Sequence, residues 1–164
     1  MSGFSVAELR VAGGTLGISP LPGRDGAYAD DLEGLLSWRP GVVLSLTSED
    51  EMQAKGACTL GPDLAGQGIA WRHFPVVDFS VPKARDRTVW TALSAEIHSG
   101  LGQGARILIH CHGGCGRSGM ILLRLMVEAG EAPDGALTRL RAVRPCAVET
   151  DMQLMWATEA SRMA

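Results

Sequence analysis

The sequence is organised around the stretch His110-Cys111-His112-Gly113-Gly114-Cys115-Gly116-Arg117-Ser118. The apolar run 105–109 before it is typical of a short buried strand, and the apolar run 120–127 after it is long enough for a helix. A glycine-rich turn between a strand and a helix directs several backbone N–H groups to one point, at the positive end of the helix dipole. The stretch therefore predicts an anion-binding loop, with phosphate as the expected anion.

The two ends of this loop indicate its chemistry. Cys111 opens it and Arg117 closes it, and the Lys-Ser or Lys-Thr pair of nucleotide-binding loops is absent. Thiols that face a guanidinium at a helix N-terminus are commonly ionised and nucleophilic. The planar fork of an arginine suits two oxygens of a phosphoryl group, and the hydroxyl of Ser118 is placed to hydrogen-bond the sulfur. We therefore expect a phosphoryl-transfer site with Cys111 as nucleophile.

The Cys-x5-Arg loop, with its preceding strand and following helix, resembles the signature loop of the cysteine-dependent protein tyrosine phosphatase superfamily. The Gly113-Gly114 pair is similar to the small dual-specificity, kinase-associated-phosphatase-like branch, and the resemblance extends from about residue 16 to the end of the chain. It implies that residues 1–164 form a single phosphatase domain. It also implies that Cys111, Arg117 and Ser118 are catalytic, and that phosphate is bound by His112, Gly113, Gly114, Cys115, Gly116 and Arg117.

Alternating strand and helix signals predict an α/β fold with a mainly parallel central sheet and helices on both faces. We expect helix 28–38 to be capped by Asp30 or Asp31, and another helix to start near Asp86. The other predicted elements are a strand or hairpin at 9–19, strands at 42–46, 69–77 and 105–109, and helices at 47–54, 120–127, 136–144 and from about 150 to Ala160.

An aspartate lies where a general acid is needed. Asp78 follows the predicted strand 69–77 and precedes Pro82, so its loop can reach over the active loop of a neighbouring strand. The segment 74–82 resembles the general-acid loop of small dual-specificity phosphatases, which implies that Asp78 protonates the leaving group. Asp86 is a competing acid, but its position suits a helix N-cap, so we predict Asp78.

The segment after Pro145 carries a further motif. An Arg-Pro pair followed by Glu-Thr and Gln resembles the segment that abuts the active site of small phosphatases. This implies that Gln153 orients the water that hydrolyses a phosphocysteine, with Glu149 as a possible helper. The alternative is a helix capped by Thr150 with Glu149 and Gln153 exposed, and the sequence does not decide between the two. The arginines of helix 136–144 are predicted to face solvent.

A metal site is an alternative for the loop, because four potential ligands lie close together in the sequence, namely His110, Cys111, His112 and Cys115. Structural zinc sites usually pair two ligand clusters, and the sequence has no second Cys-x2-Cys or His-x3-His cluster. We therefore predict no metal and no other cofactor. His110 is expected to be a buried hydrogen-bonding residue rather than an acid–base catalyst.

Cysteine usage bears on the compartment. The chain has four cysteines without a disulfide-like pattern, which favours a reducing environment. Cys115 is expected to be a small apolar filler, since a bridge to Cys111 would not suit an inward-facing loop, while Cys58 and Cys146 are not placed by the sequence. The first residues do not read as a secretion signal, and no apolar run reaches the ~20 residues that span a bilayer. These features predict a cytoplasmic protein that does not act in a membrane.

Composition and net charge limit the classes of substrate and binding partner that we expect. The net charge is −3, and the chain of 164 residues shows no basic stripe with interleaved aromatics, which argues against nucleic acid. We predict a protein tyrosine or dual-specificity phosphatase that acts on a phosphorylated protein or peptide. A phosphoinositide or other small phosphomonoester is the second choice, because the loop contains no lysine. A catalytically silent phosphate-binding module and a redox or metal protein using Cys111 and Cys115 are the remaining alternatives. The oligomeric state is not predicted.

Overall fold

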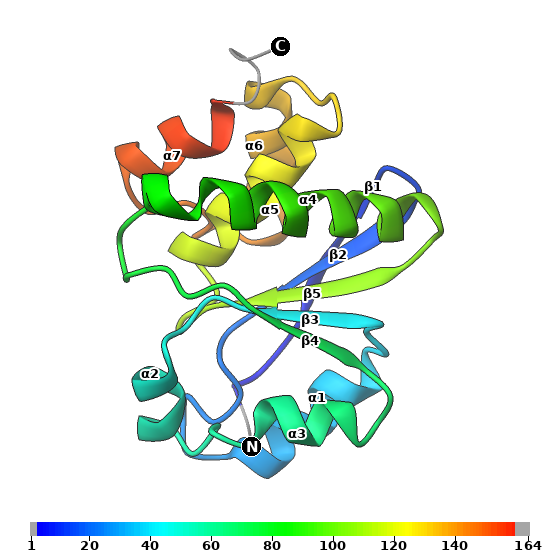
Figure 1. Ribbon diagram of the computed structural model, residues 1–164, viewed down its shortest axis with the longest axis vertical. Coiled ribbons are helices and arrows are strands. Elements are labelled where there is room, and N and C mark those ends of the chain that lie inside the picture. The colour runs from blue at the N-terminus through cyan, green and yellow to red at the C-terminus, as the bar shows by residue number, and fades with distance from the viewer. Residues whose placement is uncertain (1–2, 160–164) are drawn as a thin grey trace.

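The computed structural model describes residues 3–159, which contain a five-stranded sheet in the order β1-β2-β5-β3-β4 (Figure 1). β1 pairs with β2 in antiparallel fashion, and the other three pairings are parallel. This is the predicted mainly parallel sheet, with the predicted hairpin at its edge. The strands are β1 (Ala7–Val11), β2 (Gly14–Ser19), β3 (Val42–Ser45), β4 (Ala70–His73) and β5 (Arg106–His110).

Helices cover both faces of the sheet, as the sequence predicted. Helices α4 to α7 lie on one face and α1 to α3 on the other (Figure 1). None of the helices within residues 3–159 is long and apolar enough to cross a membrane. The helices are α1 (Tyr28–Ser37), α2 (Glu49–Ala54), α3 (Leu60–Ala65), α4 (Arg87–Gly102) after the short 3-10 turn η1 (Ala84–Asp86), α5 (Gly116–Glu128), α6 (Pro133–Val143) and α7 (Asp151–Thr158).

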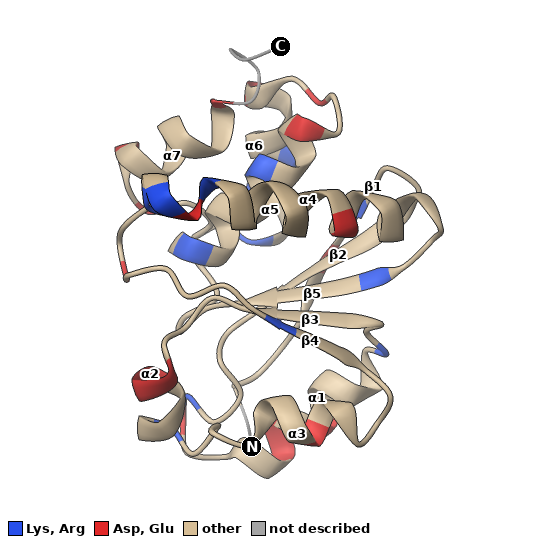
Figure 2. Ribbon diagram, viewed as in Figure 1, with Lys and Arg blue, Asp and Glu red and all other residues tan. Residues whose placement is uncertain are grey.

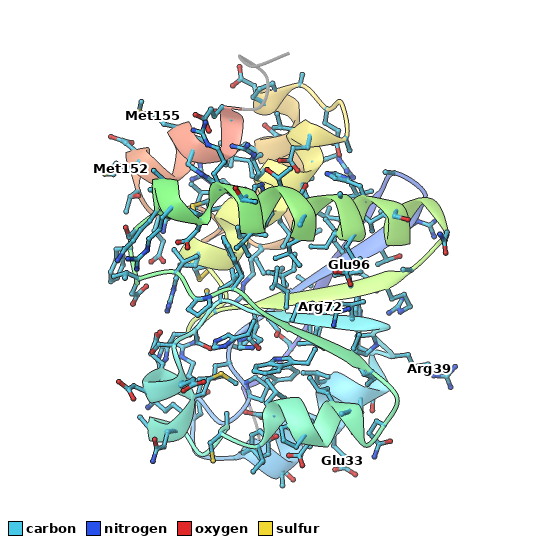
Figure 3. The ribbon with its side chains drawn as sticks, in the orientation of Figure 1. Glu33, Arg39, Arg72, Glu96, Met152 and Met155 are labelled. Carbon is cyan, nitrogen blue, oxygen red and sulfur yellow. A yellow bond between two sulfur atoms is a disulfide. The ribbon has the colours of Figure 1, made fainter. Side chains whose placement is uncertain are left out.

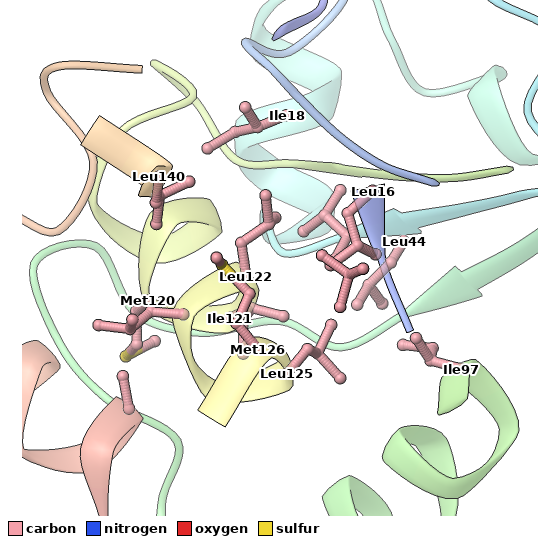
Figure 4. Close-up of a cluster of buried hydrophobic side chains, with 14 of the residues drawn as sticks. Leu16, Ile18, Leu44, Ile97, Met120, Ile121, Leu122, Leu125, Met126 and Leu140 are labelled. Carbon is pink, nitrogen blue, oxygen red and sulfur yellow. The ribbon is translucent and has the colours of Figure 1, made fainter. Parts of the chain in front are cut away.

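The central strand β5 is buried on both faces, and its side chains alternate between two apolar clusters. Ile107 and Ile109 join the cluster beneath α4 and α5, whereas Leu108 joins the cluster above α1 and α3. Figure 4 shows Leu122 of α5 among the strand residues of the first cluster. Every residue of α5 from Gly116 to Val127 is buried. A fully buried aliphatic side chain contributes roughly 1.5–3 kcal/mol to the free energy of unfolding. Helix α5 therefore holds the end of the loop that precedes it firmly in place.

The predicted end of the strand 69–77 was wrong. β4 ends at His73 rather than near residue 77, because Pro75 has no N–H to donate to the ladder. Phe74 and Val76 still donate to the carbonyls of Ser45 and Leu46, at 2.9 and 3.0 Å, so the chain continues beside β3 as it approaches the acid loop. The predicted end of the last helix, Ala160, lies outside the described residues.

The predicted aspartate cap of α1 was also wrong. The N-cap position is Ala27, and no side chain caps it. Asp31 is instead buried, and its Oδ2 accepts a hydrogen bond from the Gly23 N–H at 2.8 Å. Its carboxylate therefore stabilises the turn before the helix rather than the helix end.

A carboxylate at the end of α5 joins that helix to α4. Glu128 accepts hydrogen bonds from Trp90 Nε1, Ser94 Oγ and Arg124 Nε at 3.2, 2.5 and 2.8 Å. His98 Nε2 lies 3.0 Å from its Oε1. Burial by itself would raise the pKa of Glu128, but the hydrogen bonds from these four side chains outweigh burial and lower that pKa to about 2.

We expect Glu128→Gln to lower the free energy of unfolding by about 1–3 kcal/mol at neutral pH. Since the pKa of Glu128 is depressed in the folded state, its contribution is fully present above the ordinary glutamate pKa of 4.5 and is lost as the pH falls towards about 2. Urea denaturation at neutral pH and along an acid series measures both effects.

Glu96→Gln is the matched control, because Glu96 pairs with Arg72 at the surface (Figure 3). Exposed pairs typically contribute less than about 1 kcal/mol. Equal losses in the two variants would contradict a special role for Glu128.

Candidate active site

The predicted anion loop lies at the carboxyl edge of the sheet. Cys111 follows directly after β5, which lies between β2 and β3. The chain leaving β2 and the chain leaving β3 both reach this edge, where Leu21 N–H donates to the His112 carbonyl and Leu46 N–H to the His110 carbonyl, each at 3.0 Å. In open α/β sheets this edge is where ligands bind.

The carbonyl groups of the loop are held from outside. Arg144 donates from Nη2 to the Gly113 carbonyl at 2.9 Å and from Nε to the Gly114 carbonyl at 2.8 Å. Within residues 3–159, the N–H groups of residues 112–115 have no acceptor. Outward carbonyls and unsatisfied N–H groups at the start of α5 are the arrangement that an anion cradle requires.

Glycine is required at one position of the cradle and favoured at a second. Gly114 has a φ of 72°, and a Cβ there would lie 2.6 Å from the backbone carbon of Ser19. At Gly116 a Cβ would collide with the carboxylate of Glu149. A side chain at Gly114 would have to displace the backbone that follows β2, whereas a Cβ at Gly116 would displace only the flexible end of the Glu149 side chain.

Cys111 is buried at the floor of this cradle, with 3% of its surface exposed. Its Sγ lies 3.1 Å from the Ser118 Oγ, in the first turn of α5. A hydroxyl at this distance can donate a hydrogen bond to a thiolate. The structure thus brings together the sulfur and the hydroxyl that the sequence predicted as partners.

The guanidinium of Arg117 is almost fully buried, with 1% exposed, and most of its donors are taken. Nη1 donates to Glu51 Oε2 and to the Val76 carbonyl, both at 3.0 Å, and Nη2 donates to Glu51 Oε1 at 2.9 Å. Nε has no hydrogen-bond partner among the described residues and lies 3.4 Å from Asp78 Oδ1. Buried donors are nearly always paired, so this one is available for a ligand oxygen.

Glu51 is a site residue that the sequence did not reveal. It lies in the acidic first turn of α2, seen in red in Figure 2, and forms a capping box with Ser48. Burial raises the pKa of Glu51, but the hydrogen bonds from Arg117 and Ser48 outweigh it and lower the pKa overall. Conversely, burial lowers the pKa of Arg117, while the Glu51 hydrogen bond and the charges of Cys111, Glu51 and Asp78 raise it overall. The bidentate pair fixes the guanidinium in its charged form.

Asp78 lies in the loop after β4, and half of its side chain is exposed. Its Oδ1 accepts the N–H of Phe79, a residue in the left-handed region at φ 59°, and faces Arg117. Asp86, the competing acid, shares with Asp78 the lining of a cavity of about 530 Å³. Asp86 occupies the predicted N-cap position of α4, but its side chain makes no capping hydrogen bond. Only Asp78 of the two contacts Arg117.

Gln153 is fully buried and joins α7 to the acid loop. Its Oε1 accepts the N–H groups of Glu149 and Thr150 at 2.9 and 3.3 Å, and its Nε2 donates to the Ser80 carbonyl at 3.2 Å. The predicted Thr150 cap is present, since the Thr150 Oγ1 accepts the Gln153 N–H. Of the alternative with Glu149 and Gln153 exposed, the part on Gln153 was wrong, whereas Glu149 is exposed.

The backbone between α6 and α7 is bent towards the phosphate loop. Val148 has a φ of 68°, which is rare for a β-branched residue, and its N–H donates to the Cys115 carbonyl at 3.2 Å. Arg141 binds the carbonyls of Ala147 and Val148 at 2.9 and 3.0 Å. Arg141 is nevertheless exposed, so the predicted solvent-facing arginine face was wrong only for Arg144, which is half-buried.

The cluster of potential metal ligands diverges in three dimensions. Burial lowers the pKa of His110 to about 4, so this residue is neutral at physiological pH. Its Nε2 lies 2.5 Å from Ser45 Oγ and its Nδ1 lies 3.1 Å from the Cys111 carbonyl, as expected for a buried hydrogen-bonding histidine. No group of three or more His, Cys, Asp or Glu side chains within residues 3–159 could hold a metal ion.

Cys115 forms a disulfide with Cys146, with the two Cα atoms 5.1 Å apart. The prediction that Cys115 is a filler was therefore wrong, and so was the conclusion that the cysteines show no disulfide pattern. Sequence reasoning considered only the neighbouring Cys111 as a partner, because Cys146 lies 31 residues away in the chain. Cys58 and Cys111 are free thiols.

A family model described as "Polymorphic toxin system, DSP-PTPase phosphatase" matches residues 17–131. Among curated proteins, the chain is 31% identical over 91 residues to the "Putative tyrosine phosphatase 067L" of Invertebrate iridescent virus 3. That alignment covers 52% of this chain and 38% of the viral protein, so the chain matches less than half the length of this relative.

Solved structures share the fold over nearly the whole chain. Kinase-associated phosphatase, crystallised with its catalytic-site cysteine replaced by serine, superposes with a TM-score of 0.84 at 24% identity, covering 99% of this chain and 97% of that chain. Tk-PTP in its active form gives a TM-score of 0.72 at 24% identity, over 96% and 98% of the two chains. PTPMT1 in complex with PI(5)P gives 0.68 at 16% identity, over 96% and 99%.

Proposed function

Because the chain belongs to the DSP-PTPase phosphatase family of polymorphic toxin systems, we propose that it dephosphorylates proteins through a phosphocysteine intermediate. The observation that carries this proposal is the buried, unpaired Nε of Arg117 beside Asp78. A phosphoryl oxygen bound to that donor would lie at the cradle whose floor is Cys111. Nucleophile, charge stabiliser and acid then surround one phosphorus atom.

In the first step, the Cys111 thiolate attacks phosphorus in line with the ester oxygen. The sulfur–phosphorus bond forms while the phosphorus–oxygen bond breaks, and Asp78 gives its proton to the departing oxygen. The N–H groups of 112–115 and the Arg117 Nε stabilise the three equatorial oxygens, whose charge is spread in the transition state. The products are a phosphocysteine and a free hydroxyl compound.

In the second step, water attacks the phosphocysteine. Asp78, now a carboxylate, takes a proton from the water, and sulfur leaves as a thiolate that the Ser118 hydroxyl stabilises by a hydrogen bond. Gln153 supports this step by holding the acid loop through Ser80, and its proposed role is to orient the water. Glu149, whose carboxylate lies against Gly116, is a further polar group beside the loop.

The proposed substrates are phosphorylated proteins or peptides, including phosphotyrosine, phosphoserine and phosphothreonine. A phosphoinositide is the second candidate, because Lys83 and Arg85 line the cavity next to Asp78 and could meet a further phosphate. PTPMT1, which was solved with PI(5)P, shows that this fold accommodates such a ligand. Phosphate release from a panel of phosphopeptides and phosphoinositides separates the two candidates. A protein that binds these compounds without releasing phosphate would be a silent phosphate-binding module instead.

The expected cytoplasmic location depended in part on cysteines without a disulfide pattern. The Cys115–Cys146 bridge removes that support, because disulfides persist mainly in oxidising surroundings. We therefore propose that the phosphatase also works outside a reducing compartment. Activity retained in a buffer that keeps the bridge oxidised would support this proposal, and loss of activity there with an intact Cys111 thiol would count against it.

Asp78→Asn is expected to slow phenyl phosphate by about 10²–10⁴-fold in kcat, and 2,4-dinitrophenyl phosphate far less. The reason is that a poor leaving group needs a proton as its bond breaks, whereas an activated one departs as an anion. Steady-state kinetics on the two esters measure the difference.

Asp86→Asn is the matched control, since Asp86 lines the same cavity without contacting Arg117. This variant should slow both esters equally and only slightly. If the two esters lost the same activity in Asp78→Asn, the general acid would have to be another residue.

A further inference from the structure

The phosphate loop is held from behind by one short segment, residues 144–148, between α6 and α7. Arg144 binds the carbonyls of Gly113 and Gly114, and the Val148 N–H binds the carbonyl of Cys115. Three successive loop carbonyls are thus fixed by a segment that follows them by about thirty residues in the chain. A peptide whose carbonyl faces one way presents its N–H the other way, so these contacts also orient the inward N–H groups.

The Cys115–Cys146 disulfide lies within this set of contacts and is its only covalent member. Cys146 follows Arg144 by two residues and precedes Val148 by two, so the bridge fastens the 144–148 segment at its middle. On the loop side, Cys115 is the residue just before the helix α5. Neither sulfur is that of the nucleophile, which remains a free thiol.

Val148 gives a reason why a covalent fastening is useful here. Its left-handed conformation, with φ at 68°, is strained for a β-branched residue, and surrounding contacts must offset that strain. The hydrogen bonds to Cys115 and from Arg141 hold this conformation from both sides. Releasing the bridge would leave the strained segment held by hydrogen bonds alone.

We propose that the Cys115–Cys146 disulfide, together with Arg144, positions the phosphate loop, so that reducing this bridge weakens phosphate binding while Cys111 takes no part. The proposal rests on the proposed phosphatase function for its effect on turnover, although not for its effect on phosphate binding. Arg144, Cys115 and Cys146 are positioning residues in this account, because they act through the loop backbone.

The redox step is a thiol–disulfide exchange. The two thiols lose two electrons and two protons as the sulfur–sulfur bond forms, and a small-molecule disulfide accepts them and leaves as two thiols. A dithiol reductant reverses the reaction and itself becomes a cyclic disulfide. Oxidising surroundings would therefore favour the form with the ordered loop.

The test uses Cys111→Ser protein, in which oxidation of the nucleophile cannot interfere. Calorimetry measures its affinity for inorganic phosphate after treatment with oxidised glutathione and after treatment with dithiothreitol, and peptide mapping verifies the Cys115–Cys146 bridge. We expect reduction to raise the Kd for phosphate by at least about tenfold, since small displacements of a binding loop cost this much or more. The melting temperature should fall by roughly 6–15 °C, from the loop entropy of a 31-residue separation.

Two further variants separate positioning from general stability. Cys58→Ser, added to the same background, removes an exposed free thiol and should leave the response to reduction unchanged. Cys115→Ser with Cys146→Ser should bind phosphate as weakly as the reduced protein under both conditions. Equal phosphate affinity in the oxidised and reduced proteins, or a mapped bridge between other cysteines, would overturn the proposal.

Turnover by protein with an intact Cys111 separates this proposal from the proposed function. If the oxidised protein hydrolyses p-nitrophenyl phosphate and reduction lowers kcat/KM by the same factor as phosphate affinity, both stand. If it releases no phosphate while its phosphate affinity still responds to reduction, the proposed function fails and the positioning role stands. If the protein hydrolyses the ester and reduction changes neither hydrolysis nor phosphate binding, the positioning role is refuted and the proposed function stands.

Discussion

Cys111→Ser is expected to lower kcat for p-nitrophenyl phosphate by on the order of 10⁵-fold or more. Serine keeps the size and position of the side chain, but its hydroxyl is a weak nucleophile at neutral pH without an adjacent base. In the structure, the neighbour of the sulfur is the Ser118 hydroxyl, 3.1 Å away, and a hydroxyl is not such a base. The neutral side chain of His110, one of the two histidines adjacent to Cys111 in the chain, is directed to Ser45 instead.

Binding should survive this substitution. The N–H groups of 112–115 and the Arg117 Nε do not depend on the sulfur, so the Kd of a phosphopeptide should stay within about tenfold of the KM of the unaltered enzyme. Cys58→Ser is the control for the loss of a thiol far from the loop. Substantial turnover by Cys111→Ser would rule out the phosphocysteine route, whereas loss of both binding and turnover would point to a damaged cradle.

Arg117→Lys is expected to lower kcat/KM by on the order of 10³-fold or more, close to the effect of other arginines that stabilise phosphoryl transfer. A lysine keeps the charge but has one ammonium group instead of a planar fork. It cannot bind both oxygens of Glu51 and the Val76 carbonyl while also presenting a donor to the phosphate. Steady-state kinetics, with the melting temperature measured alongside, test this expectation.

Two controls distinguish lost chemistry from lost structure. Arg72→Lys alters an arginine that pairs with Glu96 at the surface, and should leave kcat/KM unchanged. Glu51→Gln keeps a side chain of the same shape beside Arg117 but removes its charge, and should cost about tenfold through a less firmly held guanidinium. An Arg117→Lys enzyme as active as Arg72→Lys would show that Arg117 does not stabilise the transition state.

The parts of the site that the sequence predicted depend on local order in the chain. Cys111 and Ser118 are seven residues apart, and a strand, a glycine-rich turn and a helix bring them together whatever the rest of the molecule does. The same holds for the Thr150 cap, which is contained within one turn of helix. Periodicity and turn chemistry carry such information directly.

The parts that were missed depend on contacts between distant segments. Glu51 meets Arg117 across 66 residues, and Cys146 meets Cys115 across 31. Helical periodicity identified Arg144 as part of an amphipathic helix. It did not show that the loop whose carbonyl accepts a hydrogen bond from Arg144 lies beside that helix, because only the folded chain brings the two together. An arginine on a helix is solvated by default, and only tertiary structure reveals a backbone that needs its donors.

The order of the strands has a consequence for how this catalyst can change. The nucleophile follows β5, which has a partner strand on each side, whereas the acid follows β4, the last strand of the sheet. Insertions or replacements after β4 would alter the proton donor and the surroundings of the leaving group. The sulfur of Cys111 would keep its position and its hydrogen-bond partner. Leaving-group preference is therefore the property of this scaffold that engineering can change most easily. The position of the attacking sulfur is the hardest to change.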